Sequence, residues 1–290
     1  MTLIEIDHHT QYHFSDPVEL APHRLVLRPR DGFDLLIQSS LLSIEPTPDI
    51  YWHRDAFDNS IAMVVFHQKT EKLSIRSRLS IEQYRSQTLS LDNLVPVGGP
   101  SQHSDNSFFA IFLEHHLTAT ELPPSFRLQQ DVKDGAKAFL AISQLTETIK
   151  ASFNYEAREN PGIHSAQQTL SLGYGSCRDF AWLMIEIVRC FGYPARFVSG
   201  YFMNRQFQPE EGATHAWLEV YLPQFGWLGF DPTVGRPVGP EHIAVAAAPS
   251  AEPVSPITGS FKGAADTVAD MRVSVLVSPA RAPENTMAKA

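Results

Sequence analysis

Three side chains in the second half of the chain have the types that a cysteine-dependent acyl-transfer site needs. They are Cys177, His215 and Asp231, in that chain order. A thiolate attacks acyl carbons, and a histidine is the usual base that keeps the thiol ionised, because it titrates near neutrality. A carboxylate beside the histidine orients the imidazole. The three residue types therefore predict a nucleophile, a general base and acid, and an orienting carboxylate, provided that the fold brings them together.

The segment around Cys177 predicts a buried helix that begins at the cysteine. Apolar side chains recur at steps of three and four, as on one helix face, at Phe180, Leu183, Met184, Ile187, Val188 and Phe191. Gly192 and Pro194 then supply a stop signal. Cys177 would lie in the first turn, where unpaired backbone N–H groups and the helix dipole favour a thiolate. We expect Asp179, in the same turn, to cap the helix rather than to act in catalysis.

His215 and Asp231 lie on two consecutive predicted strands, and the loop between the strands decides whether they meet. Directly opposed residues of a hairpin share a face of the sheet. A two-residue loop would put Asp231 on the wrong face, whereas a three-residue loop that pairs Leu222 with Gly226 sets it opposite Trp217 and diagonal to His215. The chemistry therefore predicts an odd loop or a bulge in this hairpin.

The first part of the chain predicts an antiparallel β domain over residues 1–125. Strand patterns occur at 23–30, 34–45, 61–67 and 73–82, the last being a clean alternation of apolar and polar side chains. The segments 61–67 and 73–82 are expected to pair as a hairpin across the polar turn QKTEK. A proline- and glycine-rich stretch then connects this domain to the second part of the chain.

The second part predicts a helix-and-sheet core over residues 126–245, so the fold class is α+β. Asp131 is expected to be the N-cap of a long first helix. The helix at Cys177 is expected to pack on an antiparallel sheet with strands at 195–202, 215–222 and 226–232. The remaining residues, 246–290, predict a strap rich in small residues and proline, a closing strand at 271–279 and a disordered tail. Whether 246–265 forms a lid over the site is left open.

Composition narrows the classes of partner. The net charge is −9 and basic residues are scattered, which argues against nucleic acid as a partner. The sequence has no signal-peptide pattern and no run of 18 apolar residues, so we expect a cytoplasmic protein that does not interact with a membrane. No CxxC, Cys/His or DxDxDG pattern occurs, so no metal and no cofactor are expected. A homodimer is compatible with the sequence, but nothing in the sequence requires it.

The motifs GSCRDFA, THAWLEVYLP and GWLGFDPT resemble the bacterial branch of the transglutaminase-like superfamily. The N-terminal segment HHTQYHFSDPVELAPHRLVLRPR resembles the β domain that precedes the core in this family, and MRVSVLV resembles its closing strand. The resemblance implies a papain-like core with Cys177 as nucleophile, His215 as general base and acid, and Asp231 as orienting carboxylate. One departure is that AAPSAEPVSP stands where the family would have a Gly-Arg-Asp run. The charged rim that such residues lend to a substrate cleft is therefore not expected here.

These residues favour a thiol protease or amidase that acts on a peptide or protein. Transamidation, in which an amine replaces water as the acyl acceptor, stays open, as does a non-catalytic module that binds peptides in the same cleft. Trp217, Trp227 and Arg178 are candidate substrate contacts. Core packing is an equal alternative for the tryptophans, and a solvated surface position is an equal alternative for the arginine.

Overall fold

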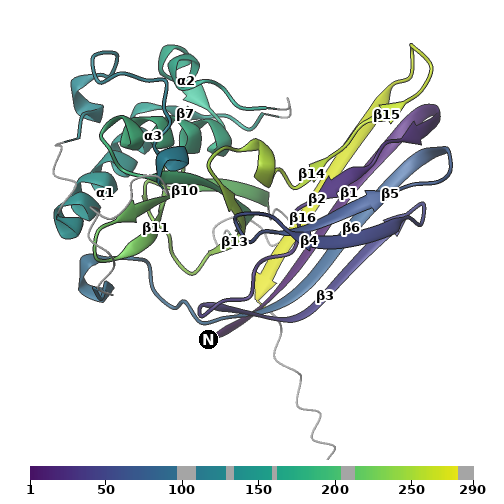
Figure 1. Ribbon diagram of the computed structural model, residues 1–290, viewed down its shortest axis with the longest axis horizontal. Coiled ribbons are helices and arrows are strands. Elements are labelled where there is room, and N and C mark those ends of the chain that lie inside the picture. Colours follow the sequence, from purple (N-terminus) through teal and green to yellow (C-terminus); the bar gives the residue numbers. More distant parts are fainter. Residues whose placement is uncertain (97–108, 129–133, 159–161, 204–212, 280–290) are drawn as a thin grey trace, which may run out of the picture.

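The computed structural model describes residues 1–96, 109–128, 134–158, 162–203 and 213–279. The elements form two lobes, one built of strands and one in which three α-helices pack against a sheet (Figure 1). Both ends of the described chain lie in the strand lobe, because the first strand and the last strand pair with each other. The expected α+β class is confirmed.

The strand lobe contains two antiparallel sheets. In the first sheet β1 lies between β6 and β16, β3 pairs with the other edge of β6, and β15 pairs with the end of β1; the second sheet has the order β14-β2-β5-β4. The alternation of apolar and polar residues predicted β6 correctly, since Leu73, Ile75, Leu79 and Ile81 are all buried. The strands of this lobe are β1 Thr2–Leu20, β2 His23–Leu25, β3 Leu35–Glu45, β4 Asp49–Arg54, β5 Ser60–Val65, β6 Thr70–Gln83, β14 Ile257–Thr258, β15 Phe261–Lys262 and β16 Ala269–Pro279.

The hairpin expected between 61–67 and 73–82 is wrong. β5 pairs with β2 and β4, whereas β6 pairs with β1 and β3, so the short turn between them carries the chain from one sheet to the other. The physical reason is burial: Ile61 and Ala62 are adjacent and both are buried, so both faces of β5 are covered. Such a strand fits the inside of a sheet between two partners rather than one arm of a half-exposed hairpin. The strand expected at 23–30 is also shorter and ends at Leu25.

The second lobe, called the core lobe below, packs its helices on a sheet of order β12-β11-β10-β9-β13. Helix α3 lies against β9 and β10, and its predicted apolar face is buried as expected. The elements are α1 Gly135–Ser152, α2 Ala166–Leu172, α3 Cys177–Cys190, β7 Asn154–Tyr155, β8 Tyr174–Gly175, β9 Ala195–Phe202, β10 Ala213–Leu222, β11 Gly226–Asp231, β12 Arg236–Pro237 and β13 His242–Ala248, with short 3-10 turns at Leu91–Asn93, Ala110–Phe112, Pro124–Phe126 and Glu252–Val254.

The first long helix starts later than the sequence suggested. Its N-cap is Asp134, whose carboxylate accepts the backbone N–H groups of Ala136 and Lys137. The expected cap, Asp131, lies outside the described residues. Both positions carry an aspartate, so cap chemistry alone could not choose between them. The expected disordered tail beyond residue 279 likewise lies outside the described residues.

The two lobes share one core. A single cluster of buried apolar side chains runs from Ile6 in the strand lobe to Phe197 in the core lobe. The fully buried Asn59 adds a pair of hydrogen bonds, because its amide donates to the carbonyl of Ala247 and accepts from the N–H of Ala247, both at 2.9 Å. The lobes therefore form one packed body. Among the described residues, no helix is long and apolar enough to cross a membrane.

Candidate functional site

Cys177 is the first residue of α3, with Ser176 as the N-cap. Its side chain lies at the border between buried and exposed, at 9%. The N–H and hydroxyl of Ser176 both donate to Asp179 Oδ2 at 2.8 Å, which closes a capping box around the cysteine. The expectation that Asp179 caps this helix is confirmed. The thiol therefore sits on a fixed turn with the backbone N–H groups of a helix start beside it.

The hairpin of β10 and β11 brings His215 next to Asp231. Leu222 pairs with Gly226, the register of the three-residue loop that the sequence predicted. His215 Nε2 lies 2.7 Å from Asp231 Oδ2, and the imidazole lines the same cleft as Cys177, whose interaction with it helps to raise the pKa of His215. Since Nε2 faces the carboxylate, Nδ1 is the nitrogen left for the thiol. The structure thus brings together all three residues that the sequence nominated.

A second imidazole, which the sequence analysis did not nominate, binds the same carboxylate. His242 is fully buried, and its Nε2 lies 2.9 Å from Asp231 Oδ2. Its Nδ1 accepts the backbone N–H of Gly239 at 3.2 Å and lies 3.3 Å from Glu241 Oε1. The bond from Gly239 assigns the ring proton to Nε2, where it points to Asp231. The available signal was a histidine at the start of the apolar run HIAVA, the position that His215 holds in its own strand. Its partner was hidden because β13 pairs with β9, which lies between β13 and the hairpin.

Charge and burial set the protonation of this group. Burial alone would lower the pKa of His215, but the charge of Asp231 and the hydrogen bonds to Asp231 and Cys177 outweigh it and hold the pKa well above its ordinary value. Burial would raise the pKa of Asp231, but the charge of His215 and the hydrogen bonds from both imidazoles hold it well below the ordinary range. The carboxylate is therefore ionised and the imidazolium is stabilised at neutral pH, as a thiolate partner requires.

The same three groups would also suit a metal ion by composition. The ligand atoms of His215, Asp231 and His242 lie within 4.8 Å of one another. Hydrogen bonding accounts for this grouping, because both imidazoles direct an Nε2 proton at one carboxylate oxygen, and a protonated nitrogen is no metal ligand.

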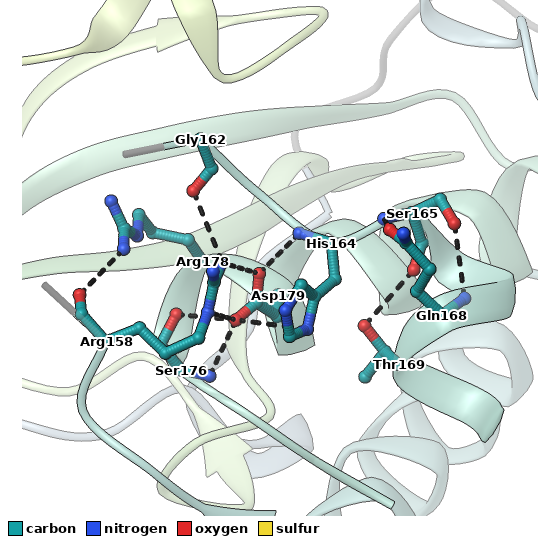
Figure 2. Close-up of polar contacts among 9 residues, drawn as sticks. All are labelled: Arg158, Gly162, His164, Ser165, Gln168, Thr169, Ser176, Arg178 and Asp179. Atoms are coloured by element: carbon teal, nitrogen blue, oxygen red, sulfur yellow. Dashed lines mark hydrogen bonds and ion pairs between the residues drawn. The ribbon is translucent and has the colours of Figure 1, made fainter. Parts of the chain in front are cut away.

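An ion pair behind the nucleophile ties the rim of the site to α3. Figure 2 shows the carboxylate of Asp179 held by two guanidinium nitrogens of Arg158, at 2.8 and 3.0 Å, and by the backbone N–H of His164 at 2.7 Å. Burial would raise the pKa of Asp179, but these donors and those of Ser176 outweigh it and lower the pKa to about 2. Arg178 Nη2 donates to the carbonyl of Arg158 at 3.0 Å, so both arginines belong to one network.

The candidate substrate contacts separate into one that faces the site and two that do not. Arg178 lines the cleft above Cys177. Trp217 is only 1% exposed and packs on Val198 behind the imidazoles, so a place on the cleft wall is wrong for it.

Trp227 lies towards the opposite end of the hairpin from Asp231. It pairs with Tyr221 near the loop, and the guanidinium carbon of Arg196 stands 4.3 Å from its ring centroid. Its assignment to the substrate site is therefore also wrong. The two errors have different causes. Trp227 shares a face with Asp231 but lies far along the strand, because residues of alternate register spread along its whole length, whereas Trp217 lies next to His215 but is buried between neighbouring strands.

The cleft that opens on Cys177 has a volume of about 790 Å³. One side comes from the core lobe and includes Tyr155 and Trp182. The other side comes from the segment after β13, including Pro256, and from β16 of the strand lobe. The segment expected as a strap thus forms a wall of the cleft.

Comparison with known families agrees with this architecture. Residues 4–82 match the family model of the bacterial transglutaminase-like N-terminal region, and residues 127–232 match that of the transglutaminase-like superfamily. This chain belongs to the transglutaminase-like superfamily. The resemblance seen in the sequence motifs is confirmed, and membership supports thiol-dependent catalysis in general terms.

Individual relatives cover different parts of the chain. An uncharacterized protein of Mycobacterium tuberculosis is 27% identical over 304 residues, which cover 93% of this chain and 91% of the relative. The protein-glutamine gamma-glutamyltransferase of Pseudomonas aeruginosa is 37% identical over 76 residues, which cover 24% of this chain and 11% of that enzyme. A crystal structure from Cytophaga hutchinsonii, of a protein proposed to be a cysteine protease, shares the fold. Its TM-score is 0.64 at 18% identity, and the match covers 98% of this chain and 95% of that one.

Proposed function

We propose that this protein is a cysteine-dependent acyl-transfer enzyme that hydrolyses peptide or amide bonds through Cys177, His215 and Asp231. The observation that carries the proposal is that Cys177 and His215 line one cleft and that Nε2 of the imidazole lies 2.7 Å from Asp231, while the interaction with Cys177 helps to raise the pKa of His215. A thiol is activated in this way when a base lies next to it and a third group orients the base.

In the proposed reaction the Cys177 thiolate attacks the carbonyl carbon of an amide. A C–S bond forms and the carbonyl oxygen gains the negative charge. The His215 imidazolium gives its proton to the leaving nitrogen, the C–N bond breaks, and a thioester remains on Cys177. The now neutral imidazole takes a proton from water, the hydroxide attacks the thioester carbon, and the C–S bond breaks. The acid is released, and the thiolate of Cys177 and the imidazolium of His215 are restored.

The developing oxyanion needs hydrogen-bond donors, and two groups of the cleft are candidates. One is the backbone N–H of Cys177 at the start of α3. The other is the hydroxyl of Tyr155, which lines the same cleft and lies on β7, whose partner in the β7–β8 pair is Gly175. Burial, then the charge of Cys177, raises the pKa of Tyr155 to about 12, so the phenol keeps its proton at neutral pH. Tyr155 is 49% exposed, and a neutral hydroxyl in the same cleft as the thiolate is suited to donate to the oxyanion.

Transamidation is the second candidate. It is favoured by the similarity of 76 residues to the protein-glutamine gamma-glutamyltransferase of Pseudomonas aeruginosa. The first half of the reaction would be identical, and an amine would replace water in the second half. Hydrolysis is the simpler proposal, because it needs no second binding site.

Alkylation of Cys177 by iodoacetamide at pH 7 tests the proposal, with the labelled peptides quantified by mass spectrometry. Cys190 is an internal control, since burial raises the pKa of its thiol. We expect Cys177 to react much faster than a free cysteine, and His215→Ala to slow Cys177 without changing Cys190. Equal rates for Cys177 in the parent and in His215→Ala would contradict the proposal.

The products then separate the two candidate reactions. Casein incubated with dansylcadaverine would yield shorter peptides if water is the acceptor at a peptide bond, ammonia without shorter peptides if water is the acceptor at a side-chain amide, and fluorescent casein of full length if the amine is the acceptor. Cys177→Ala is the matched control for both products.

A further inference from the structure

Along one face of β16, Ala269–Pro279, the side chains are exposed at one end and buried at the other. Val275 and Val277 are buried, at 4% and 6% exposed, whereas Met271 and Val273 are 50% and 51% exposed. All four side chains alternate along β16 and therefore share one face of the sheet. Half of an apolar stripe is thus covered and the other half is open.

The covered half faces the core lobe. Val275 lies opposite His8 on β1, and His8 Nδ1 is 3.1 Å from the hydroxyl of Tyr201 in the core lobe. The stripe continues from this contact past the edge of the core lobe. Met271 and Val273 line the same cleft as Cys177 and His215. The open half of the stripe is therefore a wall of the candidate active site.

This wall is held in a fixed position. The lobes share a continuous core, and Asn59 pairs with both backbone groups of Ala247. The strand lobe can therefore hold side chains at a set distance from Cys177, as a specificity site requires.

The side chains that this wall presents are mainly apolar. Met271 and Val273 line the cleft together with Pro256 and Ala251 from the segment after β13, whereas Glu252 of that segment brings a negative charge to the same side. The two arginines on the opposite side are engaged with the protein: the guanidinium of Arg158 pairs with the buried Asp179, and Arg178 Nη2 donates to the carbonyl of Arg158 at 3.0 Å. A glutamate side chain of a substrate would lose water at this wall and meet the like charge of Glu252, whereas an apolar side chain would bury area on both surfaces.

We propose that Met271 and Val273 form an apolar subsite, contributed by the strand lobe, that receives an apolar side chain of a peptide acyl donor next to the bond attacked by Cys177. The inference rests on the proposed function and adds a substrate class to it. It also gives the strand lobe a direct part in substrate selection.

Alkylation of Cys177 by acetyl-dipeptidyl chloromethyl ketones tests the subsite. The reagents form two pairs, one for each residue of the dipeptide. Within a pair, one reagent carries leucine and the other carries glutamate at the tested residue, and both carry alanine at the other residue. We expect leucine to be preferred by about tenfold at one of the positions, the size of effect typical of one apolar side chain in a pocket. Met271→Glu should abolish that preference, and Val273→Ser should weaken it.

Ser274→Glu is the control, because it adds the same charge to the opposite face of the same strand. It should keep the parental preference. Iodoacetamide, which has no side chain to place, reports the thiolate separately and should react equally with all four proteins. Slow iodoacetamide labelling in the parent would overturn the proposed function. Fast labelling by iodoacetamide with no leucine preference, or with equal loss in Met271→Glu and Ser274→Glu, would overturn the subsite alone.

Discussion

His242 donates its Nε2 proton to the Oδ2 atom of Asp231 across 2.9 Å, and neither side chain is exposed to solvent. The same oxygen accepts the proton of His215, so one carboxylate oxygen is fixed by two imidazoles that come from different strands. The other oxygen, Oδ1, accepts the backbone N–H groups of Thr233 at 2.8 Å and of Val234 at 3.3 Å. His242 therefore adds a donor to a carboxylate that the backbone already orients, at the oxygen that faces His215, and this makes it a candidate positioning residue for His215.

Replacement of His242 should therefore lower the reactivity of the Cys177 thiol, although His242 acts on it only through Asp231 and His215. His242→Leu keeps much of the volume but removes the donor, and a lost hydrogen bond to a charged group is worth about 2 kcal/mol, so we expect alkylation by iodoacetamide to slow roughly tenfold. His242→Gln retains an N–H donor and should recover most of the rate. If the two variants are equally slow, His242 has only a packing role.

Removal of metal ions should change nothing at this group. Since both imidazoles present protons to Asp231, we expect exhaustive dialysis against EDTA to leave the alkylation rate of Cys177 and the melting temperature unchanged. A fall in either value that added Zn²⁺ reverses would show instead that the three side chains hold an ion.

Tyr155→Phe distinguishes an effect on oxyanion stabilisation from an effect on the reactivity of the thiolate. Acylation of Cys177 by p-nitrophenyl acetate passes through a tetrahedral oxyanion, whereas alkylation by iodoacetamide does not. We expect the variant to release the burst of nitrophenolate about tenfold to a hundredfold more slowly than the parent, and to be alkylated at the parental rate. Tyr174→Phe, in the neighbouring strand β8, is the matched control. Equal losses in both reactions would mean that Tyr155 only shapes the cleft.

Local patterns predicted the elements that position the site. The steps of three and four after Cys177 identified α3, and the requirement that Asp231 reach His215 identified the Leu222–Gly226 register. Both inferences use contacts within one helix or one hairpin. Periodicity and pairing rules act over such short stretches of chain, so the sequence carries them directly.

Contacts between distant segments could not be predicted in this way. The partners of β5, the meeting of His242 with Asp231 and the place of β16 beside the cleft all depend on the order of strands in the sheets. The alternation of apolar and polar residues predicts which face of a strand is buried, but it does not predict which strand pairs with it. The cytoplasmic location and a homodimer stay predictions.

Loss of the ion pair behind α3 should be visible as a pH-dependent loss of stability. The pKa of Asp179 is lowered to about 2 from 3.8, so its contribution is complete above pH 3.8 and is lost as the pH falls through 2. Arg158→Met removes the main donor and should cost about 3 kcal/mol at pH 7, since it leaves a buried charge without its partner. The gap between variant and parent should narrow as the pH falls from 3.8 towards 2, because Asp179 becomes neutral in both.

Urea unfolding at pH 7, 5 and 3 measures this gap. Arg272→Met is the control, because Arg272 is 78% exposed and pairs only at the surface. A gap that stays constant over the three pH values would show that Arg158 stabilises the rim by packing rather than by charge.

The shared core predicts that the two lobes unfold together. Trp52 is the single tryptophan of the strand lobe, and the other three lie in the core lobe, so Trp52→Phe confines tryptophan fluorescence to the core lobe. We expect its fluorescence transition in urea to coincide with the transition seen by far-ultraviolet circular dichroism, because Ile6 and Phe197 belong to one buried cluster.

Asn59→Ala tests the contact that joins the lobes. It leaves the N–H and carbonyl of Ala247 without their partner in a buried position, which should cost about 3 kcal/mol. Gln38→Ala, which removes an exposed hydrogen bond to Glu82, is the control and should cost far less. If Asn59→Ala splits the single transition into two, the amide pair is what couples the lobes. If the variant keeps one transition at a lower urea concentration, the apolar cluster alone is sufficient to couple them, and β16 stays fixed beside Cys177 even without Asn59.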